Sequence, residues 1–237
     1  MVQAQRKLVF DIETASHEIE SFDDTSRRLL KTRFRKYYGD EFDEEKLESQ
    51  LTFSPLTSAI VAIGMLDAET EKGAVYFVDK SGKTTITEEG GIKFESGTES
   101  EILRKFWLVC ENFEEFITFG GRTFDAPFLM IRSAIHGIRP SKNLMPNRYL
   151  ESQPLNLRHI DLQDQLSFYS AKAERLGLHF WAKAFGIPSP KETGIVGEDI
   201  TKLFRQGKSL EIAHYCLQDV KATLELYRRW EKYLKFV

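Results

Sequence analysis

Two carboxylates, Asp11 and Glu13, interrupt an apolar run near the start of the chain, Leu8 to Phe10. Such a run is typical of a buried β-strand. Residues two apart on a strand point to the same face, so the two carboxylates should lie side by side. Like charges on a mostly buried strand are unfavourable without a cation between them, and hard oxygen ligands suit Mg²⁺ or Mn²⁺. The pair therefore indicates either a divalent metal site or an edge strand with a solvated acidic face.

A third acid, Asp125, follows a predicted strand at 116–119 and the Gly120-Gly121 turn, and it lies near the start of a predicted helix at 124–136. In open α/β sheets ligands gather at such strand ends. The alternative is an ordinary carboxylate at a helix N-terminus, where the helix dipole favours negative charge.

A fourth acid, Asp219, lies on the apolar face of the last predicted helix, together with Ile212, Cys216 and Thr223. A carboxylate that faces the core needs a partner. That partner is either a buried Arg or Lys, or a metal shared with Asp11 and Glu13.

The composition limits the classes of protein to which the chain can belong. The 237 residues are 41% hydrophobic and 29% charged, which is ordinary for a globular protein and sufficient for one α/β domain over residues 1–237. The net charge of -3 gives no overall basic field. Cys110 and Cys216 lie in helical patterns, which indicates core residues and no disulfide framework or zinc site. Without a leader-like segment or an apolar run of about 18 residues, we expect a cytoplasmic protein, or a nuclear one in a eukaryote, with no membrane partner.

The predicted elements alternate in a way that indicates a mixed β-sheet with helices on both faces. The first strand and the strands at 58–67, 74–78 and 92–94 suggest a meander, and a short strand at 158–162 carries Asp161. Besides the helix after Asp125, helices are predicted at 98–112, 173–185, 199–205 and from 209 to the C-terminus.

Residues 15–57 lack strand alternation and are predicted to be a helical insertion after the first strand. Its Arg27–Tyr38 stretch mixes cations with aromatic residues, which suits contact with a phosphate backbone and stacking of Tyr37 or Tyr38 on a base. The alternative is a solvated helix whose charges pair with the acidic segment at 40–48.

Taken together, the acidic motifs resemble those of the DEDD 3′–5′ exonucleases, which have a ribonuclease-H-like fold. Asp-x-Glu lies in the first strand, Phe-Asp follows a glycine turn, and Tyr-x-x-x-Asp lies in a late helix. The sequences Val9–Thr14 and Tyr215–Val220 resemble the corresponding motifs in the exonuclease domain of family B DNA polymerases. They resemble more closely those of the predicted stand-alone 3′–5′ exonucleases related to that domain. His159–Leu162 and residues 186–208 also resemble that group.

The resemblance implies a two-metal phosphodiesterase. Two Mg²⁺ or Mn²⁺ ions about 3.5–4 Å apart would neutralise charge on the attacking and leaving oxygens. The expected substrate is the 3′ end of single-stranded DNA, with RNA as the alternative. The implied metal ligands are Asp11, Glu13, Asp125 and Asp219, with Tyr215 positioning water, Asp161 in support, and Thr14, Arg122 and Phe124 contacting substrate.

One position departs from the family pattern, because Gly120 stands where these exonucleases usually carry Asn. The Asn amide would be expected to orient the turn or touch the substrate, so its loss bears on activity. Two further alternatives therefore stay open: a non-catalytic nucleic-acid-binding module that keeps the fold, and a structural scaffold whose acids are solvated or paired with basic residues.

Two family subclasses differ in the water-activating residue, and both spacings occur here because His214 and Tyr215 are adjacent. On a continuous helix, at about 100° per residue, Tyr215 lies roughly 40° from Asp219 and His214 roughly 140° away. Ser209 is a suitable N-cap, so the helix should begin before His214. This geometry favours Tyr215.

Overall fold

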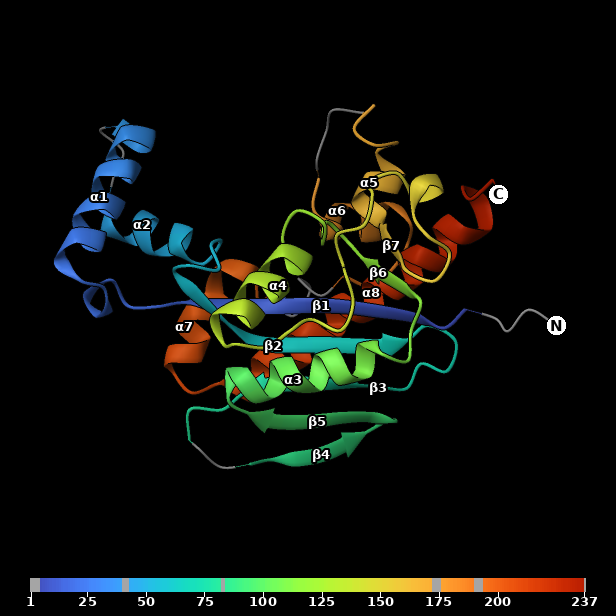
Figure 1. Cartoon of the computed structure of the whole chain (residues 1–237), viewed down its shortest axis with the longest axis horizontal. Coiled ribbons are helices and arrows are strands. Elements are labelled where there is room, and N and C mark those ends of the chain that lie inside the picture. The colour runs from blue at the N-terminus through green and yellow to red at the C-terminus, as the bar shows by residue number, and fades with distance from the viewer. Residues whose placement is uncertain (1–4, 40–42, 82–83, 172–175, 190–193, 237) are drawn as a thin grey trace.

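A computed structural model describes residues 5–39, 43–81, 84–171, 176–189 and 194–236 (Figure 1). Seven strands form one sheet, in the order β4-β5-β3-β2-β1-β6-β7. The strands are β1 Lys7–Ser16, β2 Ser58–Asp67, β3 Gly73–Val78, β4 Ile86–Glu89, β5 Ile92–Gly97, β6 Glu115–Thr118 and β7 Arg158–Asp161.

Helices connect and cover these strands, which confirms the predicted α/β class. Within the described residues, no helix is both long and apolar enough to cross a membrane. The helices are α1 Asp24–Tyr38, α2 Glu44–Leu51, α3 Glu99–Cys110, α4 Asp125–Ile135, α5 Leu162–Leu166, α6 Leu178–Ala184, α7 Ile200–Arg205 and α8 Ser209–Tyr233, with 3₁₀ turns η1 Ile19–Ser21, η3 Leu150–Ser152 and η5 Gly197–Asp199.

Strand β1 lies near the middle of the sheet, antiparallel to β2 and parallel to β6. The antiparallel succession β1-β2-β3 was predicted, but its continuation as a meander is wrong because β5 pairs with β3 in parallel. The reversal is made by β4, a strand that the sequence analysis missed. All four of its residues are exposed and only two of them, Ile86 and Thr87, are β-branched, so it carries little strand pattern.

Two hydrophobic cores lie on opposite faces of the sheet. Val9 belongs to the core beneath α8, and its neighbour Phe10 belongs to the core beneath α3 and α4. This alternation is what a central strand with both faces covered requires. Asp11 is two residues from Val9, so it faces α8, and Figure 1 shows α8 on the side of β1 opposite α3 and α4.

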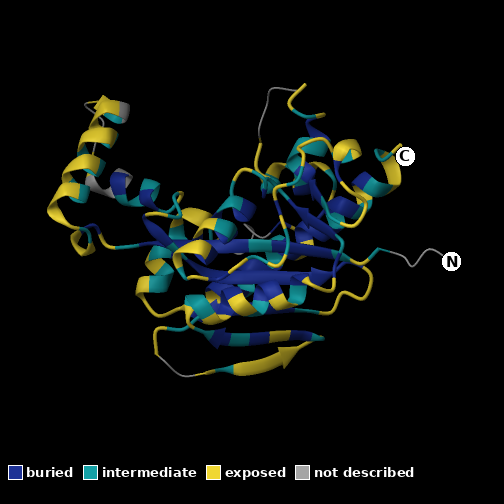
Figure 2. Ribbon diagram, in the orientation of Figure 1, coloured by how far each residue is buried: buried dark blue, intermediate teal, exposed yellow. Residues whose placement is uncertain are grey.

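The predicted insertion between the first two strands is helical. Figure 1 shows α1 and α2 projecting from the body as an arm, and Figure 2 shows that most of α1 is exposed. Inside the arm, Ile19, Leu47 and Leu51 form a small separate core. The insertion begins later than the predicted residue 15, because β1 still pairs with β2 at Ser16 and Ser58.

Two predicted helix starts need correction. Ser209 is the first residue of α8, and the N-cap position is held by Lys208 without a side-chain cap. The helix nevertheless begins before His214, as predicted. Helix α6 begins at Leu178, later than the predicted residue 173, and residues 172–175 lie outside the described part.

Candidate active site

The acids of β1 meet helix α8 at the centre of the sheet. The thiol of Cys216 lies 3.5 Å from the main-chain oxygen of Asp11 and 4.0 Å from its Oδ2. Ligand atoms of Asp11, Glu13 and Cys216 all lie within 4.8 Å of one another. Gly64, opposite Asp11 on β2, permits this approach, because a Cβ there would lie 2.9 Å from a methyl group of Val220.

Asp125 joins this group from the first turn of α4. Its carboxylate oxygen Oδ1 accepts a hydrogen bond of 3.0 Å from the backbone N–H of Ile12, the residue between Asp11 and Glu13. The side chain is buried, with 4% of the residue exposed. The Asp125 carboxylate is therefore anchored on the strand that carries the other two acids.

Helix α8 supplies the fourth acid. Tyr215 is buried and its hydroxyl hydrogen-bonds Asp219, one helical turn later, and the charge of Asp219 acts on Asp11, Glu13 and Asp125. The ring of His214 instead packs on Phe94 of β5, with centroids 4.6 Å apart. Tyr215 thus lies with the acids and His214 faces the sheet near its edge, as the helix geometry predicted.

The carboxylates raise one another's pKa. Burial, followed by the charges of Asp125, Asp219 and Glu13, raises the pKa of Asp11 well above its usual range. Burial and the charges of Asp219 and Asp125 do the same for Glu13. Burial is also the main cause that raises the pKa of Asp125, to about 7. Among the described residues, the charged groups that shift the pKa of Asp11 are all carboxylates, which favours the uptake of protons or cations by the site.

The donor set fits a hard divalent cation. Asp11, Glu13, Asp125 and Asp219 offer carboxylate oxygens, the ligands that Mg²⁺ and Mn²⁺ prefer. Cys216 was predicted to be a small core residue, and it is buried as expected. Burial and the adjacent acids raise the pKa of its thiol, so it stays protonated and is a poor metal ligand.

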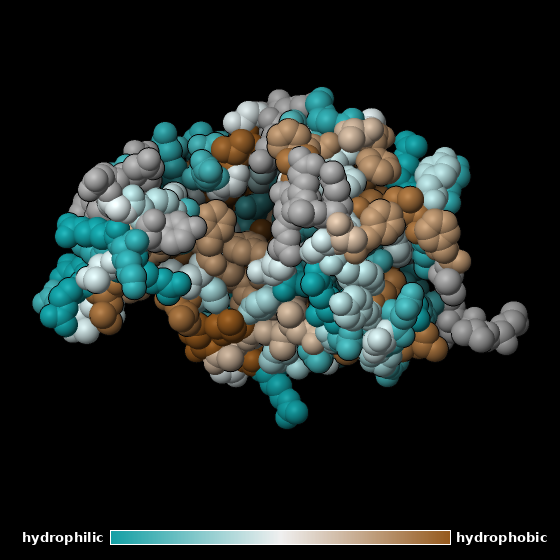
Figure 3. All heavy atoms as spheres, turned by 90° about the horizontal axis from the view of Figure 1, so that it is seen from above, coloured by the Kyte–Doolittle hydropathy of each residue, from teal (hydrophilic) through white to brown (hydrophobic). Residues whose placement is uncertain are grey.

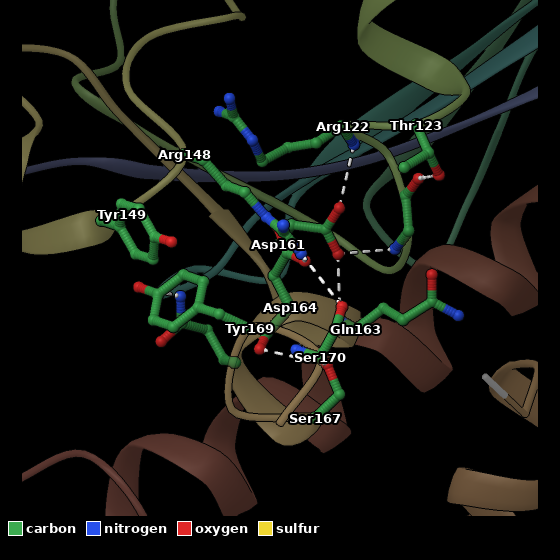
Figure 4. Close-up of polar contacts among 12 residues, drawn as sticks. Arg122, Thr123, Arg148, Tyr149, Asp161, Gln163, Asp164, Ser167, Tyr169 and Ser170 are labelled. Atoms are coloured by element: carbon green, nitrogen blue, oxygen red, sulfur yellow. Dashed lines mark hydrogen bonds and ion pairs between the residues drawn. The ribbon is translucent and has the colours of Figure 1, made fainter. Parts of the chain in front are cut away.

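Asp161 acts electrostatically on Asp125 and holds the turn that leads to it, and Figure 4 shows its hydrogen bonds with that turn. Its Oδ1 accepts hydrogen bonds from the backbone N–H groups of Gly120, at 2.7 Å, and Gln163, at 2.9 Å. Its Oδ2 accepts one of 2.9 Å from the N–H of Arg122. These bonds show that Asp161 supports the turn, and its role behind metal ligands stays a prediction.

Glycine at position 120, where the related exonucleases usually carry asparagine, is compatible with this turn. Gly120 has φ +75°, a left-handed conformation that glycine adopts freely and asparagine tolerates better than most residues. A Cβ at this position would lie 3.3 Å from Oε1 of Gln163. The backbone shape of the turn is therefore kept without the asparagine, and what is lost is its amide.

A cavity of about 420 Å³ opens beside Glu13. Thr14 and Phe124 line it, as does Phe53, which the sequence analysis did not single out. The only sequence signal for Phe53 is a lone aromatic residue shortly before the second strand. The cavity is lined by Glu13, Thr14, Thr52, Phe53, Phe124, Val196, Gly197 and Glu198.

Two predicted substrate contacts have other partners in the fold. The hydroxyl of Thr14 donates to the Thr52 carbonyl at 3.0 Å, which ties β1 to the end of the insertion. The guanidinium of Arg122 donates to the Pro146 carbonyl at 2.8 Å and does not line the cavity. A contact of Arg122 with phosphate stays a prediction.

Comparison with known proteins identifies the class. The chain belongs to the family of predicted 3′–5′ exonucleases related to the exonuclease domain of PolB, whose family model matches residues 56–235. Asp125, Tyr215 and Asp219 lie inside the match, while Asp11 and Glu13 precede it. No curated protein matches the chain.

The fold is ribonuclease-H-like and similar to that of the family B DNA polymerase from the hyperthermophilic archaeon Pyrobaculum calidifontis. The TM-score is 0.57 at 17% sequence identity. The similarity covers 96% of this chain but 24% of the polymerase, so the chain spans about a quarter of that protein's length.

Proposed function

We propose that this protein is a metal-dependent 3′–5′ exonuclease that hydrolyses phosphodiester bonds from the 3′ end of single-stranded DNA. Asp11, Glu13, Asp125 and Asp219 would hold two Mg²⁺ or Mn²⁺ ions. The observation that carries the proposal is the convergence of these four carboxylates, with raised pKa values on Asp11, Glu13 and Asp125, beside a substrate-sized cavity. Family membership supports the same reaction and polarity.

When bound, the ions neutralise charge on the attacking and leaving oxygens and make hydroxide available near neutral pH. Tyr215 has a different task. Burial and the charge of Asp219 raise the pKa of its hydroxyl, so it stays protonated and orients the attacking water without removing its proton. Asp125, anchored on the backbone of Ile12, keeps one carboxylate at a fixed place beside β1. This arrangement corresponds to the tyrosine subclass of the DEDD exonucleases.

The cavity beside Glu13 suits the end of a strand. Its volume of about 420 Å³ is that of a site for one small ligand, too small for a duplex. Phe124 and Phe53 contact each other edge to face, with centroids 6.2 Å apart, and offer apolar surface on which a terminal base can stack. Thr14 and Phe124 thereby become the residues that contact the terminal nucleotide.

The test is digestion of single-stranded DNA and RNA of one sequence, labelled at the 5′ or the 3′ end, with Mn²⁺, Mg²⁺ or EDTA. We expect 5′-labelled DNA to shorten one nucleotide at a time with either metal and to survive in EDTA. Asp219→Asn should abolish shortening, whereas Asp24→Asn, a change at a side chain that is 93% exposed, should have no effect. Faster shortening of the RNA would reassign the substrate. Intact DNA and RNA with both metals would refute the proposal.

A further inference from the structure

A second cavity lies on the far side of Phe53, between α1 and α2 of the arm. It has a volume of about 580 Å³, and Phe53 is a wall of both this cavity and the one beside Glu13. Phe53 is 57% exposed, so much of its ring surface is open to a ligand. Seen from above, the surface is hollowed between the arm and the body (Figure 3). The two cavities thus form adjoining segments of one track that begins at the acids.

The chemistry of the second cavity differs from that of the first. Leu30, Phe34 and Leu51 contribute apolar surface, and Arg33 and Lys36 contribute the charges among the lining residues that the structure describes. Both cations are exposed, and within the described part of the chain neither forms an ion pair. Apolar walls with unpaired cations suit an anionic chain that also carries flat apolar groups, which describes a nucleic acid single strand.

We propose that the arm is a second nucleotide-binding site for the strand whose 3′ end lies at the acids. In this arrangement Phe53 separates the terminal base from the bases upstream, one of which enters the cavity between α1 and α2. Arg33 and Lys36 bind the upstream phosphates. The inference rests on the proposed exonuclease function and adds to it a site in the insertion, which lies outside the stretch that the family model matches.

This site predicts that the Michaelis constant depends on strand length. Oligothymidylates of two, four and eight nucleotides are digested with Mn²⁺, and the wild type should show a KM that falls with length. Arg33→Ala combined with Lys36→Ala should raise the KM of the octamer roughly tenfold. It should also lower the slope of log KM against log salt by about 1.4, the value expected when two phosphate contacts are lost. Phe53→Ala should also raise the KM of the octamer about tenfold, through lost stacking.

Matched controls separate this site from general effects. Arg28→Ala removes one positive charge from α1 at a residue that lines neither cavity, and Leu56→Ala removes an apolar side chain that is 70% exposed and also lines neither cavity. Neither control should change the KM or the salt slope. Thermal melts of all variants establish that the arm stays folded.

The result that overturns the inference is a KM independent of length, or a salt slope that Arg33→Ala with Lys36→Ala leaves unchanged in folded protein. A failure of the proposed exonuclease function would be detected in a different assay. In that case wild-type protein with Mn²⁺ releases no nitrophenol from the p-nitrophenyl ester of thymidine 5′-monophosphate, a substrate with a single nucleotide that does not reach the arm.

Discussion

Replacing Asp125 by asparagine should stabilise the metal-free protein while it destroys the site. Burial raises the pKa of this carboxyl from its ordinary 3.8 to about 7. Each pH unit of that rise corresponds to about 1.4 kcal/mol, so the ionised folded form carries a cost of up to about 4 kcal/mol. The carbonyl oxygen of the introduced amide would keep the hydrogen bond from the Ile12 N–H. At pH 8 in EDTA, Asp125→Asn should therefore raise the free energy of unfolding by as much as about 4 kcal/mol, or Tm by up to roughly 10 °C.

The sign of the pH dependence makes this prediction specific. The folded protein holds the Asp125 proton more tightly than the unfolded chain does, so stability falls as the pH rises from about 4 to about 7. The advantage of Asp125→Asn should thus be about 4 kcal/mol at pH 8 and less than half of that at pH 5, where only part of this loss of stability has occurred. Urea unfolding at both pH values measures it, with Asp24→Asn as a control expected to stay within about 0.5 kcal/mol of the wild type. Equal effects of Asp125→Asn at both pH values would refute the electrostatic account of the site.

The other predictions concern the metal, the water-orienting residue and the glycine turn. Adding Mn²⁺ should raise Tm more at pH 8 than at pH 5.5, since fewer protons must leave Asp11 and Asp125; thermal melts that show no such trend would argue against carboxylate ligands. Tyr215→Phe should lower kcat at least about tenfold with unchanged Mn²⁺ affinity, while His214→Ala stays active; the opposite pattern in Mn²⁺-dependent digestion would place the protein in the histidine subclass. Gly120→Ala should lower the free energy of unfolding by about 1–2 kcal/mol because of the positive φ, and Gly120→Asn should cost less. Urea titrations compare the two, and an equal cost would contradict the backbone argument.

The sequence predicted the class of the fold because its main elements carry strong local patterns. The second strand, for example, was placed at 58–67, the bounds that the structure gives. Strand β4 was not predicted because all of its residues are exposed, so its sequence lacks an alternating hydrophobic pattern. The strand is held by pairing with β5, and this contact leaves no periodic signal in the sequence. The start of α8 was misassigned for a related reason. A serine hydroxyl can cap a helix, but the chain turns one residue earlier, so Ser209 became the first helical residue.

The candidate acids could be picked out because carboxylates in apolar patterns are unusual in any sequence. Their convergence, by contrast, depends on register and on the way α4 and α8 pack on β1. The role of Asp161 in holding two amides of the glycine turn, and the position of Phe53 between two cavities, arise from segments brought together only in the folded chain. No spacing rule predicts such contacts.

The order in which the site's parts are made by the ribosome has a consequence for the cell. Asp11 meets Cys216 across 205 positions of sequence, and Ile12 meets Asp125 across 113. Helix α8, which brings Tyr215 and Asp219, follows the other described helices in sequence. A nascent chain therefore displays its first acids long before the final helix can dock on them. Unfinished or C-terminally clipped copies would lack Asp219 and Tyr215, and under the proposed mechanism they would leave nearby nucleic acid intact.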